Sequence, residues 1–183
     1  ALETSTKFAA IPDNQGRDNL TSNTLNSIIE NAKDDLSCLF NTHSGEFFMG
    51  ESGTELLFRL IRNGLLASSS GGSIVGTSLE HPASRSAAKK WADEMDYTYC
   101  SVPHSVEMGT VEAEAYANNI SETTRVVTIV HASPVTGMGT KIREISKIVR
   151  HKAPLAFIIV DGIQHAAHGG IDIESYDIDG YVI

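Results

Sequence analysis

Residues 155–160 read Leu-Ala-Phe-Ile-Ile-Val, and this apolar run leads directly into Asp161-Gly162. Such a short continuous apolar run is typical of a strand that is buried on both faces of a parallel sheet. A similar run, Arg-Val-Val-Thr-Ile-Val-His at 125–131, precedes it. Between the two runs, residues 140–151 carry Ile142, Ile145, Ile148 and Val149 at helical spacing. The centre of the chain therefore predicts a parallel β-α-β unit.

The same alternation extends outward from this unit. Strand-like segments occupy 73–78, 97–102 and 180–183, and helix-like segments occupy 54–66, 83–94 and 111–118. Alternating strands and helices predict an α/β fold, with a mostly parallel sheet and helices on both faces. Residues 1–20 show little periodicity and are expected to form an irregular N-terminal arm. Residues 21–183, which begin with a helix over about 21–39, are expected to form one domain.

Composition excludes several classes of protein. The 183 residues are 41% hydrophobic and carry a net charge of −9, which is typical of a globular protein and disfavours nucleic acid or an anionic membrane as a partner. No apolar run is long enough to span a membrane, and the N-terminus lacks the layout of a signal peptide. Cys38 and Cys100 show neither metal-ligand spacing nor a disulfide framework. We therefore expect a cytoplasmic location.

Ligands of such sheets bind beyond the carboxyl ends of the strands. The segments expected at that edge are 50–54, 80–81, 131–139 and 161–170, and they hold most residues capable of chemistry. Ser52-Gly53-Thr54-Glu55 opens a helix, where free N–H groups and the helix dipole favour a phosphate and where Gly53 permits close approach. A plain helix cap is the alternative interpretation of this short motif.

Two further positions are candidates for chemistry. Pro82 biases His81 toward an extended backbone, from which the imidazole suits stacking on a planar ligand, acid–base work or simple solvation. Asp161 ends an apolar strand, where a carboxylate can meet a ligand cation or a ring N–H. Together with His165 and His168 it forms a candidate metal set, although HEXXH and recognised zinc spacing are both absent. A helix-capping aspartate with two surface histidines is the structural alternative.

Taken together, four segments resemble the class-V aminotransferase and cysteine desulfurase-like family of fold-type I enzymes, which depend on pyridoxal 5′-phosphate (PLP). The resemblance extends from about residue 47 to residue 183. The four segments, in the family's order, are Ser52-Gly53-Thr54-Glu55, Leu79-Glu80-His81-Pro82-Ala83-Ser84, His131-Ala132-Ser133-Pro134-Val135-Thr136-Gly137 and Asp161-Gly162-Ile163-Gln164-His165-Ala166-Ala167-His168-Gly169-Gly170-Ile171-Asp172.

The resemblance implies a role for each matching position. Gly53 and Thr54 match residues that hold the PLP phosphate, and His81 matches a histidine that stacks on the pyridine ring. Asp161 matches the aspartate that pairs with the ring nitrogen, and Gln164 matches a residue that hydrogen-bonds the phenolic oxygen. On this basis His81 and Asp161 are the expected catalytic residues, all five are expected to bind the cofactor, and no metal site is expected.

The chain departs from the family pattern at two places. Pro134 stands where the family usually carries an Asn, so side-chain and backbone donors are both lost there. None of the seven lysines follows a matching strand, and the chain stops within the strand expected at 180–183. We therefore expect residues 21–183 to be a PLP-binding large domain that ends before the Schiff-base lysine, and this stretch alone to be inactive. Neither cysteine lies in a cofactor loop, so neither is assigned as a nucleophile.

The resemblance implies a PLP-dependent enzyme that acts on an amino acid through an external aldimine. Transamination, desulfuration or other C–S lysis, and epimerisation remain open as the reaction. A homodimer is implied as well, with a small-molecule substrate and neither nucleic acid nor membrane as a partner. Two other classes stay open: a metal-dependent hydrolase that uses Asp161, His165 and His168, and a non-catalytic α/β binding module.

Overall fold

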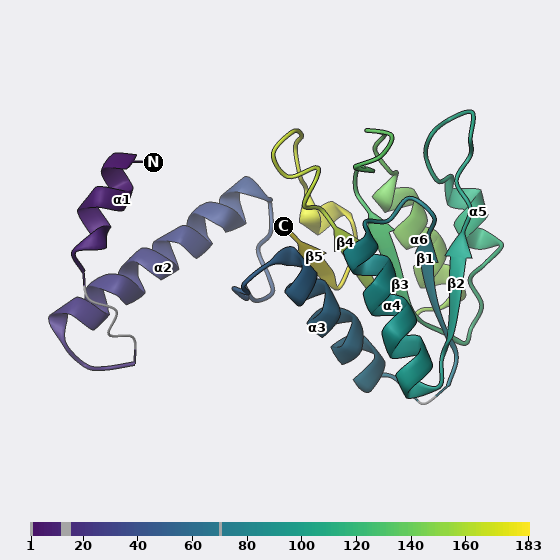
Figure 1. The fold of residues 1–183 in the computed structure, drawn as a ribbon, viewed down its shortest axis with the longest axis horizontal. Helices are drawn as coiled ribbons and strands as arrows, with labels where there is room; N and C mark the ends of the chain where they lie inside the picture. Colours follow the sequence, from purple (N-terminus) through teal and green to yellow (C-terminus); the bar gives the residue numbers. More distant parts are fainter. Residues whose placement is uncertain (1, 12–15, 70) are drawn as a thin grey trace. The chain divides into compact units, whose positions relative to one another are not determined.

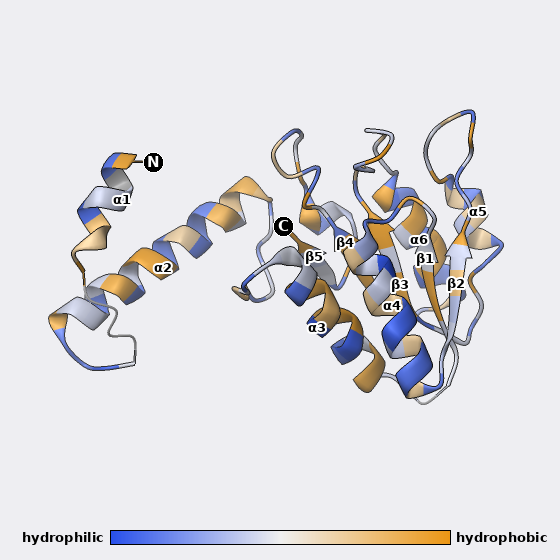
Figure 2. Cartoon of the chain, viewed as in Figure 1, coloured by the Kyte–Doolittle hydropathy of each residue, from blue (hydrophilic) through white to orange (hydrophobic). Residues whose placement is uncertain are grey.

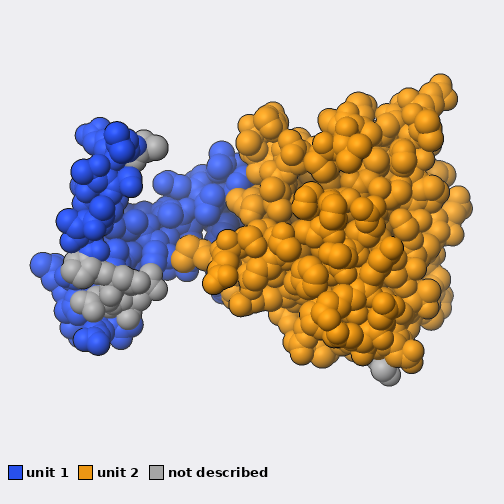
Figure 3. Space-filling model, viewed as in Figure 1, with its two compact units in different colours: residues 1–47 blue, residues 48–183 orange. Residues whose placement is uncertain are grey.

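The computed structural model describes residues 2–11, 16–69 and 71–183 of the chain (Figure 1). Its contacts divide the chain into two compact units, residues 1–47 and residues 48–183 (Figure 3). The second unit contains every segment that the sequence placed at the candidate site. The boundary between the units lies after the second helix, whereas the sequence placed a boundary at residue 20.

The first unit consists of the helices α1 (Leu2–Ala9) and α2 (Leu20–Leu39). The expectation of an irregular arm is therefore wrong for residues 2–9, because eight residues are too few to show a period in the sequence. Residues 12–15 of that arm lie outside the described residues. Asn19 caps α2, and its side chain accepts a hydrogen bond from Ser22 N at 3.0 Å. Within the described ranges, no helix is both long and apolar enough to cross a membrane.

The second unit is a five-stranded parallel sheet in the order β2-β1-β3-β4-β5. This confirms the predicted α/β fold, and most predicted element bounds lie within two residues of those observed. The elements in chain order are α3 (Gly53–Leu66), β1 (Ser73–Thr77), α4 (Pro82–Met95), β2 (Thr98–Val102), α5 (Ala113–Ala117), β3 (Thr124–Val130), α6 (Ile142–Lys152), β4 (Phe157–Asp161), a 3₁₀ turn (Ile173–Ser175) and β5 (Gly180–Val182).

Helices cover both faces of the sheet, and each face has its own core. On one face α3 and α4 pack against residues such as Val126 and Ile159, and on the other α5 and α6 pack against residues such as Val127 and Ile158. Neighbouring strand residues thus point to opposite cores, which explains why the central strands β3 and β4 carry apolar residues on both faces. The strands β1 and β3 accordingly show as hydrophobic, whereas α4 has large hydrophilic stretches (Figure 2).

The strand order creates a topological switch point between β1 and β3. From β1 the chain continues through α4 to β2 on one side, whereas from β3 it continues through α6 to β4 on the other. Since α4 and α6 cover opposite faces, the segments that leave β1 and β3 diverge at the carboxyl edge of the sheet. Open α/β sheets bind ligands in the crevice that such a divergence leaves.

The core of the α6 face offers a direct test of this packing. Ile145 is fully buried between α6 and the sheet, whereas Leu155 is 87% exposed. We expect Ile145→Ala to lower the free energy of unfolding by about 2–5 kcal/mol, because the cavity left behind cannot close completely. Leu155→Ala, the matched control, should change it by less than about 0.5 kcal/mol. Urea denaturation measures both values, and similar losses in the two variants contradict the packing.

Candidate active site

A cavity of about 380 Å³ opens at the carboxyl edge of the sheet, beside the switch point. This volume lies within the usual range for small-molecule sites. The cavity gathers all five residues that the resemblance assigned to the cofactor, although they come from three separate segments of the chain. Its lining consists of Gly53, Thr54, His81, Ala83, Val130, Ala132, Pro134, Asp161, Ile163 and Gln164.

The N-terminus of α3 supplies one side of the cavity. Ser52 caps the helix, and its Oγ accepts a hydrogen bond from Glu55 N at 3.2 Å. The N–H groups of Gly53 and Thr54 belong to the first turn, where no carbonyl within the helix can accept from them. A Cβ on Gly53 would lie 2.2 Å from Cδ1 of Ile163, so α3 packs closely on the loop after β4 and a larger residue at position 53 would displace the Ile163 side chain. The arrangement suits an anion.

Asp161 is the last residue of β4 and is only 5% exposed. Its Oδ1 accepts a hydrogen bond from Ile163 N at 3.2 Å. Burial raises the pKa of the Asp161 carboxyl, and the hydrogen bond from Ile163 and the neighbouring His81 offset part of that rise. A buried carboxylate that borders a cavity is stabilised by any cation or N–H donor that a ligand brings to it.

His81 and Gln164 border the cavity from two different loops. His81 caps α4 with an extended backbone, and its Nδ1 accepts a hydrogen bond from Ala83 N at 3.2 Å. This bond fixes the imidazole and leaves Nε2 for a ligand. Gln164 lies in the turn that follows Asp161. His81 and Gln164 are both exposed residues. The extended backbone that Pro82 predicted at His81 is therefore confirmed.

Glu80 lies directly before His81, but its carboxyl group is buried, with 3% of the residue exposed. Three groups donate hydrogen bonds to it: Thr77 N at 3.0 Å, Ser84 Oγ at 2.9 Å and Thr128 Oγ1. Burial raises the pKa of Glu80 to about 7, even though these donors act in the opposite direction. The sequence placed Glu80 in a loop at the strand edge and gave no signal of this network.

A cluster of aromatic side chains lies at the ends of β3 and β5. His131 is 7% exposed, its Nδ1 is 2.6 Å from the hydroxyl of Tyr181, and its ring stacks on that of His165 with centroids 3.6 Å apart. Burial and the nearby His165 lower the pKa of His131 to about 4. His165 therefore packs against His131. This contact accounts for the position of the His165 side chain without any bound ligand.

The metal interpretation of Asp161, His165 and His168 finds no support in this geometry. Asp161 borders the cavity, whereas His165 stacks on His131. Over residues 2–11, 16–69 and 71–183, no group of three or more His, Cys, Asp and Glu side chains is arranged to hold a metal ion.

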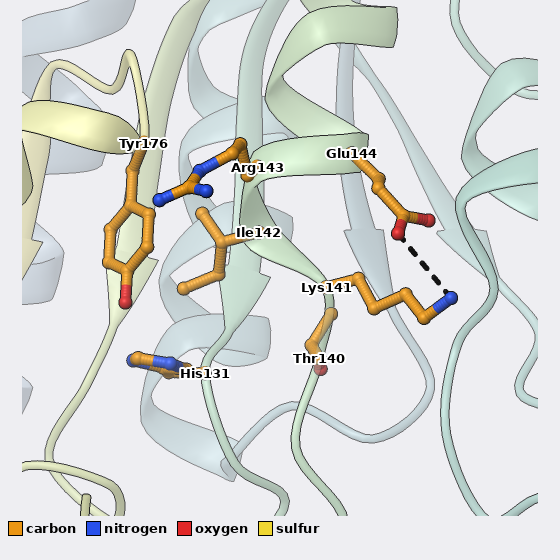
Figure 4. Close-up of a pocket in the computed structure, with 7 residues that line it drawn as sticks. All are labelled: His131, Thr140, Lys141, Ile142, Arg143, Glu144 and Tyr176. Carbon is orange, nitrogen blue, oxygen red and sulfur yellow. Dashed lines mark ion pairs between the residues drawn. The ribbon is translucent and has the colours of Figure 1, made fainter. Parts of the chain in front are cut away.

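A second cavity of about 300 Å³ lies at the N-terminus of α6 (Figure 4). Its charged groups are already paired: Lys141 Nζ lies 3.4 Å from Glu144, and Arg143 donates to Ser175 O at 3.2 Å and to Asp172 at 3.4 Å. Figure 4 shows Lys141 directed toward Glu144 and away from Tyr176. None of the five residues that the resemblance assigned to the cofactor borders this cavity, so the first cavity remains the candidate active site.

The comparisons with known proteins point to one family. The family model described as aminotransferase class-V matches residues 4–183, which is nearly the whole chain. The chain belongs to the class-V aminotransferase family. The cofactor of this family is PLP, so the expected family and cofactor are confirmed.

Relatives of this class-V chain include cysteine desulfurase-like proteins. The cysteine desulfurase-like protein ustD of Aspergillus flavus is 30% identical over 155 residues, which cover 81% of this chain and 35% of that protein. A solved NifS-like protein superposes with a TM-score of 0.87 at 19% identity and covers 99% of this chain and 50% of its own. The cystine C–S lyase C-DES, solved with its product cysteine persulfide, gives 0.79 at 22% identity, with 99% and 48% covered. The chain thus spans half or less of the length of these proteins.

The residues of the cavity fit PLP. The first turn of α3 offers N–H donors for a phosphate, Asp161 offers a buried carboxylate for a protonated ring nitrogen, and His81 offers an imidazole held in place by Ala83. The sequence missed the apolar walls that Val130, Ala132 and Ile163 contribute to the cavity. Apolar residues are common in every buried segment, so only their position in the fold could identify them.

Two buried groups near the site should oppose each other in the pH dependence of stability. Glu80 has a folded pKa of about 7 against 4.5 normally, so the folded protein keeps a proton that the unfolded chain releases, and stability falls as pH rises through this window. His131 has a folded pKa of about 4 against 6.5 normally, so the unfolded chain takes up a proton that the folded protein does not. The stability that neutral His131 contributes is therefore lost as pH falls through this window.

We therefore expect Glu80→Gln to make the free energy of unfolding rise more steeply between about pH 5 and 7, by on the order of 1–3 kcal/mol over that interval. In this variant the opposing effect of the Glu80 carboxyl is absent, so the remaining rise in the free energy of unfolding comes from His131. Urea denaturation at several pH values measures it. Glu107→Gln, at an exposed loop position, is the control. A slope unchanged by Glu80→Gln contradicts the assignment.

Proposed function

We propose that the whole protein catalyses a PLP-dependent reaction of an amino acid in the cavity at the switch point. The proposal rests on one observation: the N-terminus of α3, His81, Asp161 and Gln164 border the same cavity. They provide an anion site, an imidazole, a buried carboxylate and an amide, which together match the functional groups of PLP. Each of these residue roles comes from the family resemblance and is supported by this placement.

The role proposed for α3 is to hold the phosphate. The N–H groups of Gly53 and Thr54 donate to it, the Thr54 hydroxyl adds a further donor, and the helix dipole favours its negative charge. Gly53 also brings the helix close to Ile163, whose side chain borders the same cavity. These contacts would place the phosphate end of the cofactor and leave its ring near Asp161.

The role proposed for Asp161 is to hold a proton on the ring nitrogen. A buried carboxylate gains most from a cationic partner, because its own burial raises its pKa and disfavours its charge in the absence of one. His81 would stack on the ring and transfer protons through Nε2, and Gln164 would donate to the phenolic oxygen. When bound, PLP withdraws electrons from the α-carbon of the amino acid and so weakens the bonds at that carbon.

Among the reactions of this family, we propose C–S bond cleavage of a sulfur-containing amino acid. The supporting observation is that the relatives include a cysteine desulfurase-like protein and that a cystine C–S lyase shares the fold. Pro134 borders the cavity and has no N–H to donate. Substrate recognition on this side of the cavity should therefore rely on shape, together with Val130 and Ala132.

The rest of the active site is proposed to come from outside these 183 residues. Among the described residues that border the cavity there is no lysine, and Lys152, the last in the chain, donates from Nζ to Ala117 O. We propose that a lysine beyond Ile183 supplies the Schiff-base amine, and that the large domain comprises residues 21–183 together with that segment. A homodimer and a cytoplasmic location, which fits the free thiols of Cys38 and Cys100, are parts of the same proposal.

We expect the full-length protein to bind PLP covalently. Addition of PLP to the apoprotein should produce a visible absorption band, because the bound cofactor is conjugated to an amine, and borohydride should abolish that band. Absorption spectroscopy measures both changes. Sulfide release from cysteine or cystine then tests the proposed reaction. A full-length protein that stays colourless after incubation with PLP shows that the cavity is not a PLP site and favours a non-catalytic binding module.

We expect Asp161→Ala to impair catalysis far more than folding. The lost partner of the ring nitrogen should lower kcat/KM by about 10²–10⁴-fold, whereas the free energy of unfolding should change by less than about 1–2 kcal/mol. Steady-state kinetics and urea denaturation give the two values. Asp93→Ala, which alters an exposed acid on α4, is the control. Equal turnover of Asp161→Ala and the parent protein assigns Asp161 a purely structural role.

A further inference from the structure

Glu80 is a buried acid to which neither the family resemblance nor the proposed reaction gives a role. We propose that Glu80 is a positioning residue: its buried carboxyl group holds the β1–α4 turn in the conformation that directs the imidazole of His81 toward the cavity. This inference deepens the proposed function and rests on it only where it concerns the cofactor.

The hydrogen bonds of Glu80 come from both ends of the turn and from the neighbouring strand. Thr77 is the last residue of β1, Ser84 lies in the first turn of α4, and Thr128 lies in the middle of β3. His81 lies between Thr77 and Ser84 in the chain. One carboxyl group therefore closes the segment that carries His81 and attaches it to the centre of the sheet.

The backbone held by Glu80 also determines the direction of the His81 imidazole. His81 has φ −57° and ψ 144°, and its Nδ1 accepts a hydrogen bond from Ala83 N, so the direction of the imidazole depends on the backbone of residues 81–83. The side chain of Glu80 is held inside the protein, whereas His81 is exposed and its imidazole borders the cavity. Loss of the Glu80 hydrogen bonds would free the backbone between Thr77 and Ser84, and with it the direction of the imidazole.

The residues packed around the Glu80 carboxyl leave no room for a larger side chain and depend on it as an acceptor. A Cβ at Gly76 would lie 2.9 Å from Oε1 of Glu80 and 2.8 Å from Oγ1 of Thr128, so a larger residue in β1 would displace the network. Thr128 and Ser84 are each 1% exposed, and an apolar residue at position 80 would leave both buried hydroxyls without this acceptor. The three hydrogen bonds to the Glu80 carboxyl restrain the segments that they join.

The test compares four variants of the full-length protein. Glu80→Ala removes the acceptor, and Glu80→Gln keeps its shape and an oxygen that accepts from Thr77 and Thr128. Ser84→Ala removes a single donor, in case Glu80→Ala does not fold. Ser146→Ala is the matched control, because Ser146 is also 1% exposed and hydrogen-bonded but lies on α6, on the other face of the sheet.

Two readouts separate positioning from general stability. Without PLP, hydrogen–deuterium exchange of residues 78–84 should rise by about 10-fold in Glu80→Ala, rise less in Ser84→Ala, and stay within about 3-fold of the parent in Glu80→Gln and Ser146→Ala. With PLP, the visible circular dichroism per bound cofactor should fall by about half in Glu80→Ala and recover in Glu80→Gln, because a loosely held His81 no longer fixes the ring.

Each outcome decides the matter. Exchange that is unchanged in Glu80→Ala and Ser84→Ala, or a Glu80→Gln variant that behaves like Glu80→Ala, overturns the positioning role. An unchanged dichroism in Glu80→Ala limits Glu80 to a structural role without effect on the cofactor, which also overturns the proposal. A parent protein that binds no PLP refutes the proposed function instead, whereas the exchange comparison, made without PLP, still tests whether Glu80 holds the turn.

Discussion

The pairing of β1 with β3 is the constraint on which the site depends. These strands are adjacent and parallel, but α4 leaves β1 toward one face of the sheet and α6 leaves β3 toward the other. The divergence keeps the carboxyl edge open there, and the ladder from β3 to β4 places Asp161 beside Val130 at the border of the opening. A shift in the pairing of β3 with β4 would move the Asp161 carboxylate away from the cavity. Because the apolar pattern of the strands sets this register, it also determines where the carboxylate lies.

The sequence predicted the second unit well, because its elements are long or strongly periodic. The strand expected at 125–131 is Thr124–Val130, and the helix expected at 140–151 is Ile142–Lys152. The five residues assigned by resemblance border one cavity, because parallel strands bring their carboxyl ends to one edge whatever their separation in the chain. Loops at that edge could therefore be named before their contacts were known.

What the sequence could not predict depends on contacts between distant residues. The helix α1 is too short to reveal a period. The carboxyl group of Glu80 is buried through Thr128, 48 positions away, and the partner of His131 is Tyr181, 50 positions away. In the sequence Ile163 is an ordinary loop residue, and only the folded structure shows that Gly53 of α3 packs against it. In each case the local residues permit several environments, and the tertiary fold selects one.

The charges of the cavity explain which ligand it can accept. Its described lining includes a carboxylate and an imidazole but neither lysine nor arginine. Burial raises the pKa of the nearby Glu80 carboxyl, and the charge of Asp161 adds to that rise. An anion alone would meet only the dipole of α3 as a favourable charge, with Asp161 opposing it. A ligand that carries its own positive charge at the end away from the anion removes this conflict, because the charge meets Asp161 while the anion meets the helix. A phosphate joined by a short rigid ring to a protonated nitrogen satisfies both ends at once. With an anion site at the N-terminus of α3 and a buried carboxylate at the end of β4, the cavity therefore suits a dipolar ligand.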